Sequence, residues 1–116
     1  LMGKYIEISK KLKEDIFNGK FKEDEKLPSA RKLAQNYEIN VATVLRALHV
    51  LREQQIICKN RTSRFYVCHN ISCIRQKCVR QEIQNFFDKM SLLGYSKIEV
   101  QNLLTKQLKK ESVFKR

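Results

Sequence analysis

Residues 27–57, LPSARKLAQNYEINVATVLRALHVLREQQII, decide the fold of this chain. They predict two short helices joined by a tight polar turn and followed at once by a strand. The chain carries 24 Lys and Arg residues against 12 Asp and Glu residues. A helix-turn-helix on so basic a chain is typical of a head that reads DNA.

Length and charge limit the fold and the partner. The chain has 116 residues and is 42% hydrophobic, which suffices for one compact core, or a small core with an appended helical element. The formal net charge of +12 predicts a polyanionic partner: nucleic acid is the commonest, and a membrane surface is the rival. No apolar run approaches the ~20 residues of a membrane span, and the start lacks the apolar stretch of a signal peptide. We therefore expect no membrane partner and a cytoplasmic location.

The cysteine pattern indicates neither a disulfide framework nor a zinc site. The four cysteines are Cys58, Cys68, Cys73 and Cys78. A reducing cytosol favours free thiols over disulfides. The sequence has no C-x-x-C pair, and its only histidines are His49 and His69. Because tetrahedral zinc sites need closer ligand spacing, we expect no metal and no cofactor.

The first 40 residues predict two helices. Residues 4–17 form an amphipathic pattern that ends at Asn18-Gly19, where glycine can take a left-handed conformation. The apolar positions of this helix are Ile8, Leu12 and Ile16. After a charged loop, Pro28 and Ser29 open the second helix, because proline tolerates the first turn and a serine hydroxyl can cap it.

The third helix, roughly residues 41–53, is expected to begin at an Asn40 cap. Its inward stripe is predicted to be Val41, Val44, Leu48 and Leu51. Its opposite face carries Ala42, Thr43, Arg46 and His49. Small and polar side chains with one arginine can lie against base edges, which favours a recognition helix. The alternative is an ordinary surface helix.

Two short β-type runs follow, at Ile56–Lys59 and Phe65–His69. The segment between them predicts a hairpin with a basic tip, in which Lys59, Arg61 and Arg64 can reach phosphates or a minor groove. The alternative is a flexible cationic turn. Three helices followed by a hairpin are the order of a winged helix.

Residues 74–108 predict two more helices, separated by Gly94 and a capping box from Ser96 to Glu99. Each has an apolar stripe that a free-standing pair of helices cannot bury. We expect these stripes to pair with a second copy of the chain, with packing inside one chain as the alternative. The expected dimer contacts are Val79, Ile83, Phe86, Phe87, Met90, Val100, Leu103 and Leu104.

Three segments resemble the amino-terminal domain of GntR-type transcription regulators: NGKF at 18–21, KLPSARKLA at 26–34 and INVATVLRAL at 39–48. Only about forty residues follow the predicted wing, as in the short YtrA-type subfamily. The resemblance implies a mainly α fold with a small β-hairpin: an amino-terminal winged helix-turn-helix at 4–70, two dimerisation helices at 71–110 and a charged tail at 111–116.

The resemblance also implies which residues approach DNA. These are Ser29, Arg31, Asn40, Val41, Ala42, Thr43, Arg46, Thr62, Ser63 and Arg64, and the charge pattern adds Lys59 and Arg61. The chain departs from the family twice. Many members have an arginine at the position of Val41 and glycines in the wing, where this chain has Thr62 and Arg64.

The predicted function is a dimeric repressor that occludes a promoter by binding a palindromic operator in double-stranded DNA. A small-molecule effector is left open. The alternatives are a regulator that senses thiol oxidants or metals through Cys73 and Cys78, and a nonspecific nucleic-acid-binding protein. An enzyme is not expected, because no Gly-rich phosphate loop, H-E-x-x-H or G-x-S-x-G motif is present.

Overall fold

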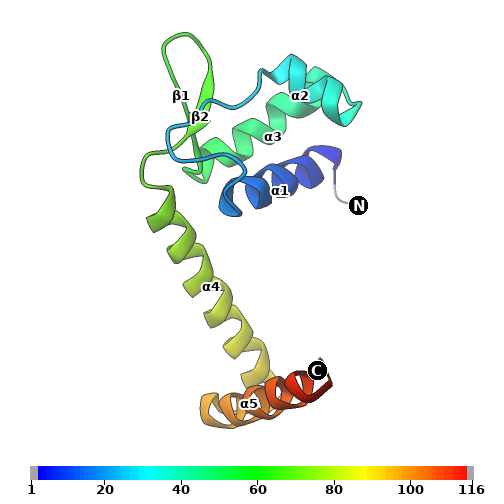
Figure 1. The fold of residues 1–116 in the computed structure, drawn as a ribbon, viewed down its shortest axis with the longest axis vertical. Coiled ribbons are helices and arrows are strands. Elements are labelled where there is room, and N and C mark those ends of the chain that lie inside the picture. Colours follow the sequence, from blue (N-terminus) through cyan, green and yellow to red (C-terminus); the bar gives the residue numbers. More distant parts are fainter. Residues whose placement is uncertain (1–2, 115–116) are drawn as a thin grey trace. The chain divides into compact units, whose positions relative to one another are not determined.

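The computed structural model describes the backbone of residues 3–114 and the side chains through residue 111. The elements are α1 (Lys4–Phe17), α2 (Ala30–Tyr37), α3 (Val41–Glu53), β1 (Ile57–Lys59), β2 (Phe65–Val67), α4 (Ile71–Leu92) and α5 (Lys97–Phe114) (Figure 1). They divide into two compact units, one up to Arg75 and one from Gln76 onward. The predicted fold class, a mainly α chain with a winged helix-turn-helix, is confirmed.

The core of the first unit lies around α3, which runs between α1 and α2 (Figure 1). Its fully buried side chains come from α1, α3, the hairpin and the loop before α2, and the largest are Leu12, Leu27, Leu48, Leu51, Ile56 and Ile57. The prediction that Val41 faces inward is wrong, because its side chain is 37% exposed. Val41 is the first residue of α3. The buried residues of this helix are Val44, Ala47, Leu48 and Leu51, so Ala47 belongs to the inward stripe and Val41 does not.

The expected helix boundaries are present with their caps. Gly19 follows α1 with φ of 86°, a conformation that glycine adopts readily and that residues with a Cβ atom rarely adopt. The Ser29 hydroxyl accepts the amide N–H of Lys32 at 3.1 Å, which caps α2. Asn40 caps α3 in the same way by accepting the amide N–H of Ala42 at 2.8 Å.

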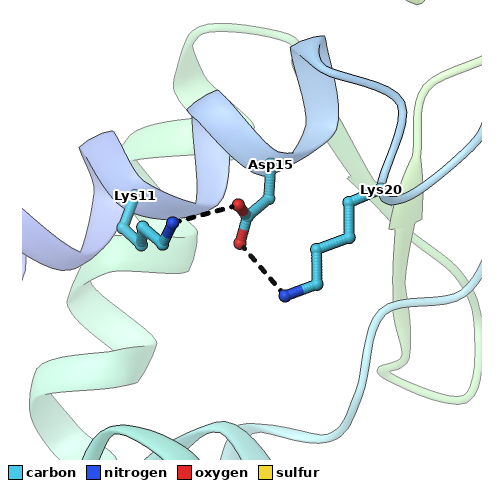
Figure 2. A network of polar contacts seen from close by, with 3 residues as sticks. All are labelled: Lys11, Asp15 and Lys20. Atoms are coloured by element: carbon cyan, nitrogen blue, oxygen red, sulfur yellow. Dashed lines mark ion pairs between the residues drawn. The ribbon is translucent and has the colours of Figure 1, made fainter.

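An acidic side chain ties the end of α1 to the loop that follows it. Asp15 is buried, and its carboxylate lies 3.4 Å from the Lys11 ammonium and 3.7 Å from that of Lys20 (Figure 2). The hydrogen bond from Lys11 to Asp15 raises the pKa of Lys11 above its ordinary value. The backbone amide of Lys20 also donates to the Asp15 carbonyl at 2.9 Å. Side chain and backbone together hold the chain reversal after α1.

The hairpin is antiparallel, with Ile57 opposite Val67 and Lys59 opposite Phe65. Its second strand is also bonded to the loop before α2: the Leu27 amide donates to the Phe65 carbonyl at 2.9 Å, and the Asp24 amide donates to the Val67 carbonyl at 3.0 Å. The loop therefore covers the outer edge of β2. This pairing fixes the hairpin to the rest of the first unit.

The expectation that all four cysteines are free thiols is wrong for two of them. Cys58 and Cys68 form a disulfide, and their Cα atoms are 5.5 Å apart. That separation suits a disulfide, and the antiparallel strand pairing produces it although the residues lie ten apart in sequence. Cys73 and Cys78 on α4 are free; Cys73 is exposed and Cys78 is half-buried.

The second unit contains α5 and most of α4. Gly94 has φ of 89°, and the predicted capping box is confirmed: the Ser96 amide donates to the Glu99 carboxylate, and the Glu99 amide donates to the Ser96 hydroxyl, each at 3.2 Å. The helix continues to Phe114, so residues 111–114 are not the separate tail that we expected. Residues 115–116 of that predicted tail lie outside the described range.

Within residues 3–114, none of the helices is both long enough and apolar enough to cross a membrane.

Candidate nucleic-acid interface

The amino end of α2 presents two of the predicted contacts. Ser29 and Arg31 are both exposed. Because the Ser29 oxygen accepts the Lys32 amide, its own hydroxyl hydrogen is free to donate to a phosphate oxygen. The amino terminus of a helix also favours an anion through its partial positive charge. This corner therefore has the chemistry of a phosphate contact.

The turn into α3 brings four more predicted contacts to the surface. Glu38 takes the left-handed conformation with φ of 55°, which lets the chain reverse in three residues. Asn40, Val41 and Ala42 are exposed and Thr43 is half-buried. An open hollow of about 520 Å³ joins this turn to α2, and Arg31, Asn40 and Val41 are among the residues that line it.

Arg46 lies one turn further along α3 and is exposed. Its guanidinium carbon is 4.0 Å from the centroid of the Tyr5 ring on α1. His49, on the same face of α3, is engaged with Glu53 at 2.9 Å. Of the two, Arg46 therefore retains the N–H groups needed to read a base or bind a phosphate.

The wing tip is organised by one side chain that sequence reasoning did not single out. The Asn60 amide oxygen accepts the backbone N–H of Thr62 at 3.0 Å, the Thr62 hydroxyl at 2.8 Å and the backbone N–H of Arg64 at 2.9 Å. Ser63, between the two positions where many family members have glycine, takes the left-handed conformation with φ of 62°. The presence of an asparagine at the start of a polar turn could have predicted this role, because asparagine side chains accept hydrogen bonds from the backbone of the turn.

The three cations of the wing have different surroundings. Lys59 lies over the Phe65 ring at 5.6 Å, and an Arg64 Nη nitrogen is 3.5 Å from the Leu27 carbonyl oxygen. Arg64 thus reaches back toward the segment that opens α2. Arg61, Thr62 and Ser63 are exposed at the tip. Arg61 is therefore the cation best placed to meet a phosphate.

One group of described side chains has the composition of a metal site. Ligand atoms of Glu23, Asp24 and His69 all lie within 4.8 Å of one another, and all three residues are exposed. His69 Nδ1 is 3.0 Å from an Asp24 carboxylate oxygen, and this hydrogen bond raises the pKa of His69 above its ordinary value. The arrangement acts as a polar tie between the loop before α2 and the end of the hairpin.

The second unit carries a surface of a different kind, formed by apolar side chains. Among the expected dimer contacts, the exposed ones are Val79, Ile83, Phe86, Leu103 and Leu104, and Phe87 and Met90 are half-buried. We call these seven residues the apolar surface. Val100 does not belong to it, because its side chain is only 1% exposed and is already buried within one chain. The apolar surface has the composition of an interface that a second protein covers.

The amino-terminal unit matches a known protein family. The model of the family described as "Bacterial regulatory proteins, gntR family" matches residues 4–67. A curated relative, an uncharacterized HTH-type transcriptional regulator YcxD of Bacillus subtilis (strain 168), is 30% identical over 66 residues, which cover 57% of this chain. The match spans 15% of that relative's length.

Two solved structures show a similar fold over more of the chain. A GntR family transcriptional regulator from Listeria monocytogenes is 29% identical with a TM-score of 0.77, over 90% of this chain and 95% of that one. YtrA from Sulfolobus acidocaldarius, a GntR-family transcription factor, is 25% identical with a TM-score of 0.57, over 72% of this chain and 88% of that one. The Listeria match includes most of the second unit.

Proposed function

The chain belongs to the gntR family of bacterial regulatory proteins, and from that membership we propose that it is a dimeric repressor that occludes a promoter by binding a palindromic operator. It is a transcription regulator and not an enzyme. The observation that carries the proposal is the exposure of the predicted contacts. Of the twelve residues expected to approach DNA, eleven are exposed and only Thr43 is half-buried.

The proposed contacts have two roles: some orient the protein on the DNA, and others read the base sequence. Ser29, Arg31 and Arg61 would bind phosphates, which fix the orientation of a protein on the duplex without reading sequence. Val41 and Ala42 would contact thymine methyl groups, because neither has a side-chain hydrogen-bond donor. Arg46 would pair with the O6 and N7 atoms of a guanine in the major groove.

The apolar surface supports the dimeric part of the proposal. Val79, Ile83 and Phe86 are 50%, 50% and 40% exposed. Leaving large apolar side chains in contact with water is unfavourable, and covering them would stabilise an assembly. A twofold pair of chains would cover the surface and present two winged helices to the two halves of a palindrome. A cytoplasmic location is part of this proposal, since the operator is there.

The test is selection of bound sequences from random duplex DNA by the full chain, followed by footprinting on the selected site. We expect a palindrome with two half-sites. The double variant Arg31→Ala/Arg46→Ala should lose the footprint and keep its fold and dimer. Exposed cations of the second unit, changed in Arg80→Ala/Lys106→Ala, provide a control with the same loss of charge.

The control should weaken binding to all DNA only slightly, because it lowers net charge without touching the proposed contacts. Full sequence-specific binding by the first double variant would overturn the proposal. Equal affinity of the unaltered chain for every duplex would indicate the nonspecific binder instead.

A further inference from the structure

Arg46 and Tyr5 form the closest contact between a cation and an aromatic ring in the described residues. The guanidinium carbon lies 4.0 Å from the ring centroid, whereas the four other such contacts measure 5.5 to 6.0 Å. Cation–π attraction acts within about 6 Å of the centroid, so Arg46 is well inside the favourable range. The two residues are 41 positions apart in sequence and belong to different helices.

The Tyr5 ring is held in place by the first unit. Its side chain is half-buried and packs against the core. A Cβ atom added at Gly3 would lie only 2.9 Å from a Tyr5 ring carbon, so the glycine leaves the space that the ring occupies. Tyr5 also lines an open hollow of about 400 Å³ together with Leu45 and Val50 on α3. The ring is therefore a fixed platform beside the outer face of α3.

Stacking restrains Arg46 without using its hydrogen-bond donors. A free arginine side chain loses rotamer entropy when it is ordered on binding, and a side chain that is already ordered loses less. The contact with the ring is made to its π face and requires none of the guanidinium N–H groups to form a hydrogen bond. No carboxylate in the described part of the chain forms an ion pair with Arg46. The donors of a pre-ordered guanidinium are thus available for a base.

We propose that Tyr5 is a positioning residue that holds the Arg46 guanidinium in the orientation that reads a base, and so sets the sequence specificity of binding. This inference rests on the proposed function. Tyr5 acts through Arg46 and need not touch DNA. A residue of the first helix, outside the helix-turn-helix, thereby takes part in recognition.

The experiment is a double-mutant cycle on the full chain with the selected duplex and a scrambled duplex. Tyr5→Leu should weaken binding to the selected site about two- to fivefold, the range of an exposed cation–π contact, and leave binding to scrambled DNA unchanged. Tyr5→Phe keeps the ring and should stay within about twofold of the unaltered chain. In the Arg46→Ala background, Tyr5→Leu should have no further effect. Phe17→Leu, which removes another half-buried ring of α1, is the matched control.

A second measurement does not require DNA. In the NMR spectrum of the free chain, the Arg46 side-chain protons should show an upfield ring-current shift that Tyr5→Phe keeps. Absence of that shift in the unaltered chain overturns the proposal, even where Tyr5→Leu does not fold. An equal loss from Tyr5→Leu with and without Arg46 also overturns it. If the unaltered chain selects no sequence, the proposed function fails; if it selects one and Tyr5→Leu binds it normally, only the role of Tyr5 fails.

Discussion

The two units of the chain differ most in how they bury apolar side chains. The first unit has its own core, with fully buried leucines and isoleucines from four segments. In the described part of the second unit, Val100 alone is buried, and α4 has no buried residue along its 22 positions. Hydrophobic burial is the main favourable term in folding. The first unit therefore has a core of its own, whereas the apolar surface of the second unit is open to the second copy that we propose.

The largest expected effect is on the core of the first unit. Leu48→Ala removes a fully buried side chain of α3 and should lower the free energy of unfolding of the first unit by about 2–5 kcal/mol. Urea unfolding followed by circular dichroism measures it. The loss should be the same at every protein concentration, because the core belongs to one chain. If the loss of stability depended strongly on protein concentration, the core of the first unit would not belong to a single chain.

The next largest effect is on the apolar surface of the second unit. Phe86→Asp places a charge on the apolar surface and should dissociate the proposed dimer, raising its dissociation constant by about a hundredfold or more. Sedimentation at several concentrations measures it, with Gln76→Asp, at an exposed polar position of the same helix, as the control. The first unit should remain folded. A chain that is monomeric before any substitution would refute the dimer.

A smaller effect concerns the covalent link that only the first unit has. Replacing Cys58 and Cys68 by serine, or reducing the unaltered chain, should lower its stability by about 2–3 kcal/mol, the scale of closing a short loop. Thermal melts with and without a reductant check this. The Cys73→Ser/Cys78→Ser variant should still lose stability on reduction. If the reductant has no effect on the unaltered chain, the disulfide does not stabilise the wing.

The smallest effect is a dependence on pH at the junction of loop and hairpin. The His69 pKa is raised by Asp24, so the folded state binds the proton more tightly than the unfolded state. The contribution is present below the ordinary histidine pKa of about 6.5 and is lost as the pH rises through the folded value. His69→Gln should therefore lower the melting temperature at pH 5.5 and leave it unchanged at pH 8.5. Asp24→Asn should abolish the same pH dependence, and a dependence that survives it would exclude this pair.

Local signals were sufficient to predict most elements and several caps. Gly19, Ser29 and Asn40 act at the ends of their own helices, so their roles follow from neighbouring residues. Contacts between distant segments were not predictable in this way. The Cys58–Cys68 bond depends on strand register, and the stacking of Arg46 on Tyr5 depends on how α1 crosses α3. Spacing along the sequence carries neither piece of information.

The exposure of Val41 shows a further limit of periodicity. A 3.6-residue repeat identifies which side chains share a stripe, but it does not say how far along the helix the neighbouring elements extend. Val41 has the spacing of the inward stripe, but it is the first residue of α3, and its side chain is 37% exposed there. The same exposure places it among the proposed DNA contacts.

The asparagine of the wing has a consequence for mutational tolerance. Three hydrogen bonds converge on the Asn60 amide oxygen, and two of them come from backbone N–H groups that every residue except proline possesses. These two bonds do not depend on the side chains at 61 and 62, so replacing those side chains would remove at most the bond from the Thr62 hydroxyl. A library randomised at these two sites and constant at Asn60 would sample many surfaces for the proposed DNA contacts on one hairpin, and it could be used to alter the proposed operator preference.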